Sequence, residues 1–199
     1  MTARASSNPA ALPARRTRTS AIALIAVFAA LAAALGYALA WLPNVELLTF
    51  AVFASGVALG KWRGALVGAL AMALYSGVNP QGSGLAVPPL FAAQIAGASL
   101  SGLAGGTTRG LWSGVGRTNL ARGAVVGAAL GLAVTVAYQV LVVAGYWAAM
   151  VRSESSLLAA VTAGGLFSVL HVVSNTVAFA VLAPAVLPRL TRRGTIPPR

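Results

Sequence analysis

A long stretch of this chain, residues 44–106, carries almost no charge. Its only formal charges are Glu46, Lys61 and Arg63, and each of them sits at the end of an apolar segment. Water or lipid headgroups can solvate charges at segment ends, whereas the middle of each segment is left for lipid or for other helices. A water-soluble domain is not built in this way.

The composition extends this reading to the whole chain. Hydrophobic residues make up 58% and charged residues 8% of the 199 residues, against roughly 25% charged residues in an average soluble domain. We therefore expect an all-α membrane protein, a compact bundle of six transmembrane helices. Hydropathy places the spans at about 20–42, 45–60, 62–78, 88–107, 122–146 and 156–187.

The distribution of Lys and Arg gives the expected orientation. Six spans leave only Arg152 on one side, and they place on the other side Arg4, Arg15, Arg16, Arg18, Lys61, Arg63, Arg109, Arg117, Arg122, Arg189, Arg192, Arg193 and Arg199. Positive residues favour the cytoplasmic side, so we expect both termini to be cytoplasmic and the protein to be a multi-pass component of a prokaryotic inner (plasma) membrane. This topology also explains the net charge of +12 better than nucleic-acid binding does, because the basic and aromatic residues share no stripe.

Spans 45–60 and 62–78 are short, and a re-entrant hairpin is an alternative for them. The turn between them carries Lys61 and Arg63. Each of these charges would lie in hydrocarbon at the tip of a re-entrant loop, at a cost of about 2.5–3.5 kcal/mol. We therefore favour two full spans joined at the cytoplasmic surface.

Three regions are expected along the chain. Residues 1–19 form a polar, disordered cytoplasmic tail, 20–188 form the transmembrane domain, and 189–199 form a basic cytoplasmic tail. The apolar run after the first tail is too long for the core of a signal peptide and lacks a convincing cleavage site, so we interpret it as a retained helix.

Few residues are available for catalysis. The chain has no cysteine, one histidine and two acidic residues, and it shows neither metal-ligand spacing nor a phosphate-binding loop. An intramembrane enzyme using His171 with Ser168 or Ser174 is conceivable, but spacings of three residues on one helix seldom position such a pair for proton transfer. We expect no enzymatic activity, no metal and no cofactor.

Glycines recur at helical spacing, which in a membrane lets helix backbones approach closely. The main sets are Gly56, Gly60, Gly64 and Gly68, and Gly123, Gly127 and Gly131. Packing inside one bundle is the favoured interpretation. Docking of other helices onto these faces is the alternative.

Polar residues inside the spans fall at a similar depth if each helix rises about 1.5 Å per residue. They come from different segments: Asn44, Glu46, Tyr75, Gln94, Tyr138, Gln139, His171 and Asn175. Polar side chains within a membrane tend to face the bundle interior and often mark a substrate path. The shared depth predicts a pocket open to the outside, although individual residues can equally be interhelical hydrogen-bond partners, and Glu46 can be a helix N-terminal residue capped by Asn44.

Several short motifs, in this order, resemble the substrate-specific S components of energy-coupling factor (ECF) transporters. They are Pro43-Asn44-Val45-Glu46 before a helix, Gly60-Lys61-x-x-Gly64-Ala65-x-x-Gly68-Ala69, the polar Asn79-Pro80 loop, and Pro88-Pro89-x-x-x-Ala92-x-Gln94-x-x-Gly97. The resemblance covers residues 44–106 and the six-helix layout elsewhere.

The resemblance implies a non-enzymatic subunit that binds a vitamin or similar micronutrient at the outer face. Members of the family associate with a coupling membrane protein and two cytoplasmic ATPases, and an Ala-x-x-x-Ala pattern on their first helix contacts the coupling protein. Ala29 and Ala33 match that pattern here, as do other alanine pairs of the same segment. The expected substrate-binding residues are Asn44, Glu46, Tyr75, Asn79, Gln94, Gln139, His171 and Asn175. The alternative is an accessory or assembly membrane protein that binds no small molecule.

Overall fold

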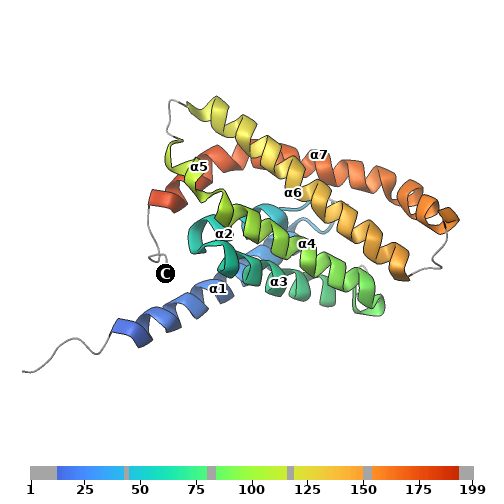
Figure 1. The fold of residues 1–199 in the computed structure, drawn as a ribbon, viewed down its shortest axis with the longest axis horizontal. Coiled ribbons are helices and arrows are strands. Elements are labelled where there is room, and N and C mark those ends of the chain that lie inside the picture. Colours follow the sequence, from blue (N-terminus) through green and yellow to red (C-terminus); the bar gives the residue numbers. More distant parts are fainter. Residues whose placement is uncertain (1–12, 43–44, 80–83, 116–118, 150–153, 193–199) are drawn as a thin grey trace, which may run out of the picture.

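The computed structural model describes residues 13–42, 45–79, 84–115, 119–149 and 154–192, and in these ranges the chain is helical (Figure 1). The elements are α1 (Pro13–Ala38), α2 (Leu48–Leu59), α3 (Lys61–Gly77), a 3₁₀ turn η1 (Gly84–Ala86), α4 (Pro88–Thr107), α5 (Arg109–Ser113), α6 (Leu120–Ala149) and α7 (Glu154–Arg192). The predicted all-α class is thus confirmed for the described residues.

Three of these helices are long and apolar enough to cross a membrane. The qualifying segments are Ser20–Ala38, Leu120–Ala149 and Gly164–Thr191. Many large apolar side chains on the outside of the bundle are exposed, among them Val125 at 70% and Val181 at 64%. Lipid is a suitable environment for such a surface, and the protein is therefore a helical membrane protein.

Helix boundaries differ from the predicted spans mainly at polar ends. α1 begins at Pro13, so part of the predicted N-terminal tail is helical, and α7 continues to Arg192, into the predicted C-terminal tail. Residues 1–12 and 193–199 lie outside the described structure. Proline at the first position of α1 fits the start of a helix, because its missing N–H would have no partner there.

α2 lies at the centre of the bundle, since each of its residues from Leu48 to Leu59 is buried. Its 12 residues span about 18 Å, well short of the roughly 30 Å of hydrocarbon in a bilayer. It is followed directly by α3, and Gly60 makes the turn with a φ of 93°, which disfavours other residues.

Glycines bring α2, α3 and α4 into backbone contact. A Cβ built on Gly56 would lie 2.0 Å from the carbonyl oxygen of Gly102, and one on Gly102 would lie 2.1 Å from that of Gly64. Helices approach this closely only where side chains are absent. The glycine faces of these helices therefore serve packing inside the bundle, as the favoured interpretation expected.

α6 and α7 pair in antiparallel fashion through a second glycine face. Gly131 packs on the ring of Phe179, and Gly127 packs on the Phe179 carbonyl and on Ala183. Phe179 in turn meets Phe50 and Phe53 of α2 edge to face, with ring centroids 5.1 and 5.2 Å apart. These contacts join the α6–α7 pair to the central helix.

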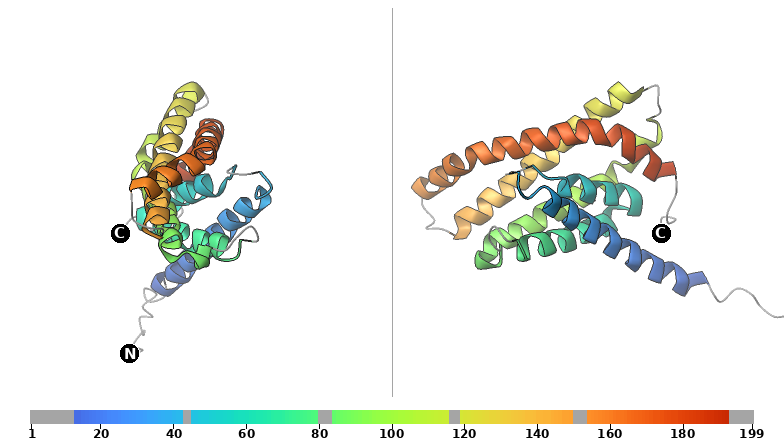
Figure 2. Two further views of the ribbon diagram at one scale, coloured as in Figure 1. Left: turned by 90° about the vertical axis from the view of Figure 1, so that its right-hand side faces the viewer. Right: turned by 180° about the vertical axis from the view of Figure 1, so that it is seen from behind.

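Helix directions alternate along the chain. The Tyr37 hydroxyl donates to the carbonyl oxygens of Leu74 and Tyr75, so the C-terminal ends of α1 and α3 lie together. The start of α1, the α2–α3 turn, α5, the start of α6 and the end of α7 all lie at the other end of the bundle (Figures 1 and 2). Lys61, Arg63, Arg109, Arg122 and Arg189 belong to these segments. The described basic residues therefore gather at one end.

Candidate functional site

Glu46 and His171 form the centre of the candidate site. Nε2 of His171 lies 3.2 Å from Oε1 of Glu46, and the two side chains are 6% and 12% exposed, respectively. The Thr49 hydroxyl donates to the same Oε1 over 2.5 Å. Glu46 stands two residues before α2, whose cap position is Leu47 and not the predicted Asn44, which lies outside the described residues. A carboxylate at this helix N-terminus is favoured by the helix dipole.

Tyr138 adds a third segment to this centre. Its ring meets the His171 ring edge to face, with centroids 5.5 Å apart. Tyr138 also packs against Gly97 of α4, where an added Cβ would lie 2.5 Å from the tyrosine ring. The segment before α2, α6 and α7 thus converge on the Glu46–His171 pair, with α4 behind Tyr138.

Asn175 lies one turn after His171 on α7, and Thr135 lies one turn before Tyr138 on α6. We call these two residues the inner polar pair. Both residues are 0% exposed. Within the described part of the chain, the amide nitrogen and oxygen of Asn175 have no hydrogen-bond partner, and the Thr135 hydroxyl has none either. Buried polar groups are nearly always hydrogen-bonded, so this pair retains capacity for a further partner.

Gln94 belongs to a separate contact at the outer ends of α3 and α4. Its Oε1 accepts a hydrogen bond of 2.6 Å from Ser76, and Gly84 of η1 lies against both side chains. The structure therefore connects Gln94 with η1 and not directly with the Glu46–His171 pair. Asn79 follows α3 at this end and is half-buried.

Tyr75 faces α1. Its ring packs on Tyr37, with centroids 5.1 Å apart, and on Gly36. Such contacts hold α1 against α3. Of the predicted layer, the structure brings Glu46, Tyr138 and His171 together, and it places Tyr75 and Gln94 in neighbouring pairs.

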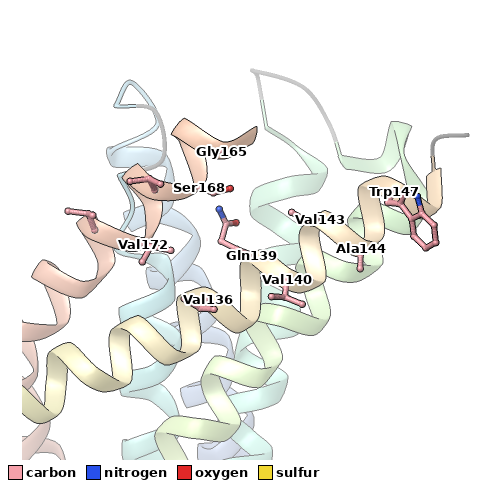
Figure 3. Close-up of a pocket in the computed structure, with 11 residues that line it drawn as sticks. Val136, Gln139, Val140, Val143, Ala144, Trp147, Gly165, Ser168 and Val172 are labelled. Atoms are coloured by element: carbon pink, nitrogen blue, oxygen red, sulfur yellow. The ribbon is translucent and has the colours of Figure 1, made fainter. Parts of the chain in front are cut away.

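Gln139 lines a groove of about 680 Å³ between α6 and α7 (Figure 3). Its side-chain amide points toward Ser168 on the facing helix. The other walls are mainly apolar and are formed by Val136, Val140, Val143, Ala144, Trp147, Gly165, Val169, Val172 and Val173. The groove therefore combines an apolar surface with one amide and one hydroxyl.

Ala29 and Ala33 are 3% and 6% exposed. They face the chain's own core, and Ala29 packs with residues of α2 and α3. The exposed alanines of α1 are instead Ala23, Ala26, Ala30, Ala34 and Ala38. A partner helix that approached α1 from outside would meet these residues and not the predicted pair.

The sequence analysis overlooked three residues that the site uses. Thr49 is one helical turn from Glu46, Thr135 is one turn from Tyr138, and Ser76 begins the segment that leads to Asn79. Each of the three lies three residues from a polar residue that was selected, and this helical spacing could have identified them from the sequence.

The polar groups and the groove of the described site offer the means of binding a small molecule. The described residues contain no group of three or more His, Asp or Glu side chains that could hold a metal ion. His171 directs Nε2 at Glu46, and the Ser174 hydroxyl donates to the His171 backbone carbonyl. Hydrogen-bonding groups, aromatic edges and an apolar groove are suited to hold a small molecule.

Comparisons with known proteins place the chain in no family. No protein-family model matches it, and no curated protein or solved structure does. The class that the fold defines is a helical membrane protein, and the resemblance to S components remains an expectation from the sequence.

Proposed function

We propose that this protein is the substrate-binding subunit of an uptake transporter of the ECF type, which captures a vitamin-like micronutrient at the outer face. The observation that carries the proposal is the convergence of Glu46, Tyr138 and His171 from separate segments beside Asn175, whose amide has no partner among the described residues. Ionisable residues inside a membrane are costly and are a functional-site hypothesis by default.

The short central helix supports the same proposal. α2 begins inside the bundle, so its N-terminus directs backbone N–H groups and the positive end of its dipole toward the Glu46 layer. Transporters commonly place binding sites at the ends of discontinuous or short helices near the middle of the membrane. A protein that only anchored other proteins would not need this arrangement.

In the proposed topology six helices cross the membrane and both termini are cytoplasmic, because the basic residues gather at the end where α1 begins and α7 ends. The membrane is a prokaryotic inner membrane. The partners are a coupling membrane protein and two cytoplasmic ATPases. The coupling protein contacts the exposed face of α1 at Ala26, Ala30 and Ala34, since Ala29 and Ala33 are buried.

The docking alternative loses the surfaces on which it depended. Gly56, Gly64 and Gly102 already contact one another, and Gly127 and Gly131 are covered by α7. An assembly protein would have to use other faces. The structure therefore favours the binding function over the accessory one.

Ligand co-purification tests the proposed function. We would purify the full chain gently into lipid nanodiscs and analyse denatured extracts by mass spectrometry, comparing the wild type with Asn175→Ala and with the control Thr176→Val. Thr176 follows Asn175, but its hydroxyl is bound to the Val172 carbonyl. A stoichiometric compound present in the wild type and the control and lost in Asn175→Ala supports the proposal. Preparations from rich medium that repeatedly carry no compound, together with a flat thermal-shift screen against vitamins, would sink it.

A further inference from the structure

The inner polar pair differs from the other hydroxyl residues of the spans. Thr176, Ser99 and Thr162 each donate to the carbonyl four residues earlier, which is the usual way a membrane helix satisfies a hydroxyl. Thr135 makes no such bond, and Asn175 has both a free donor and a free acceptor. Both side chains are fully buried. Their hydrogen-bonding groups are thus turned into the interior without a partner in the described part of the chain.

The register of α6 and α7 places these two residues at the same level of the bundle. Gly131 meets Phe179 on one side of them and Tyr138 meets His171 on the other, so in an antiparallel pair Thr135 lies at the level of Asn175. The groove of Figure 3 ends at this level, because Val136 and Val172 line it and are close neighbours of the pair along their helices. The pair itself does not line the groove: both residues are fully buried, Thr135 next to Val136 and Asn175 three residues after Val172, at the level of the groove's inner end.

The Glu46 carboxylate already has partners within the protein. Glu46 is held by His171 and Thr49, so a cationic ligand would have to displace the histidine. Every described Lys and Arg lies at the basic end, at the start of α1, α3, α5 or α6 or near the end of α7. No described cation is therefore available to receive a carboxylate or a phosphate. Among the described residues, then, no charged side chain is left to pair with a charged ligand group at this level.

We infer that the ligand presents an uncharged amide-type edge, an N–H beside a C=O, to Asn175, as a carboxamide, lactam or ureide does. The two atoms of the asparagine amide match such an edge in a two-point hydrogen bond, with the Thr135 hydroxyl as a third partner. The rest of the ligand is apolar and lies in the groove, against Val136, Val140, Val143, Val169, Val172 and Val173. This inference rests on the proposed function and specifies its substrate class.

Matched probes test the inference on the full chain in nanodiscs. Each pair keeps one skeleton and exchanges the amide for a carboxylate: nicotinamide and nicotinate, indole-3-acetamide and indole-3-acetate, octanamide and octanoate, with octylammonium as the cationic probe. Thermal shift and titration calorimetry measure binding to the wild type, Asn175→Leu, Thr135→Val and the control Thr176→Val. We expect amides to bind at least tenfold more tightly than their acids. Asn175→Leu should weaken amide binding at least tenfold and Thr135→Val at least threefold, with Thr176→Val unchanged.

The outcomes separate the inference from the proposed function. Tighter binding of a charged probe, or amide binding that survives Asn175→Leu, overturns the inference and leaves a binding subunit. If no probe binds but a compound co-purifies, an uncharged amide edge in that compound supports the inference, and the absence of such an edge overturns it. If no probe binds and no compound co-purifies, the proposed function fails and the inference fails with it.

Discussion

Replacement of Asn175 by leucine should stabilise the ligand-free protein. Leucine keeps the branched shape of asparagine and removes the two amide atoms that have no partner among the described residues. A buried polar group without a partner costs about 1–3 kcal/mol, and apolar replacements at such sites are neutral or stabilising. Because leucine is somewhat larger and packing strain opposes part of the gain, we expect a net increase of about 1–3 kcal/mol.

The predicted gain is measurable as a thermal shift. For a chain of 150–250 residues, 1 kcal/mol corresponds to about 2–4 °C in Tm, so a gain of about 1–3 kcal/mol in Asn175→Leu should raise Tm by roughly 2–12 °C. The assay is scanning fluorimetry of the ligand-free protein in nanodiscs, because the chain has four tryptophans. Thr135→Val should act in the same direction with a smaller effect, since it removes one unpartnered hydroxyl.

A structural role for Asn175 predicts the opposite sign. If the Asn175 amide formed a hydrogen bond between two helices, Asn175→Leu would remove that bond and Tm would fall. Such bonds in membranes contribute about 0.6 kcal/mol on average. The control is Thr176→Val, whose hydroxyl is bonded within its own helix and should change Tm little. A clear fall in Tm for Asn175→Leu, with the control unchanged, would refute the reasoning.

Three further perturbations check the packing and the central pair. His171→Leu leaves the buried Glu46 carboxylate with the Thr49 hydroxyl as its remaining described partner and should cost about 3–5 kcal/mol. Glu46→Gln in the same chain should restore much of this loss, and purely additive losses in a double-mutant cycle would contradict the pairing. Gly102→Ala should prevent assembly of a stable bundle because its Cβ would lie 2.1 Å from a backbone carbonyl oxygen, whereas Gly77→Ala, with no atom within 4 Å of the added Cβ, should be tolerated. Size-exclusion chromatography in detergent compares the two variants. A monodisperse Gly102→Ala protein would contradict the close contact. Trp112→Phe removes an indole N–H that has no partner among the described residues, but it leaves a cavity around the smaller ring at a fully buried site. Because the two effects oppose each other, Tm should change by less than about 3 °C, and a larger fall would contradict this balance.

The helices could be predicted from the sequence wherever their ends carry clear signals. α4 has the predicted bounds because Pro88 and Pro89 begin it and glycines with threonines end it. The ends of α1 and α7 were misplaced because hydropathy detects apolar residues and not helicity, so polar turns such as the one at Pro13 are invisible to it. The six crossings and their orientation remain predictions.

The faces of the helices were harder to predict than their positions. α2 is apolar on all sides, and a helix in contact with lipid has the same composition as one at the centre of a bundle. In α1, alanines occupy both faces, so Ala29 and Ala26 could not be distinguished without the contacts of α2 and α3. Hydrophobic periodicity cannot distinguish the two faces of a helix where the core-facing and the lipid-facing surfaces are equally hydrophobic.

Polar residues at the site could be selected from the sequence, but their partners could not. Glu46 and His171 were both selected, yet nothing in a sequence joins two residues so far apart until the packing of α2 against α7 is known. Thr135 was overlooked because a threonine inside a helix usually bonds to its own backbone. Its distinction is the absence of that bond, which only coordinates reveal.

The position of the groove follows from the order of small and branched residues along α6. In the inner half, Gly127 and Gly131 let α7 approach until Phe179 rests on the helix backbone. In the outer half, the glycine face of α6 continues with Thr135 and Tyr138, and Gly164 and Gly165 of α7 meet almost nothing. The groove lies beside this half, on the face of Val136, Val140 and Val143, and begins at the level of Thr135. In the proposed binding mode, the inner polar pair selects the polar end of the ligand because it lies where the close packing ends, and the valines of the groove select the apolar end.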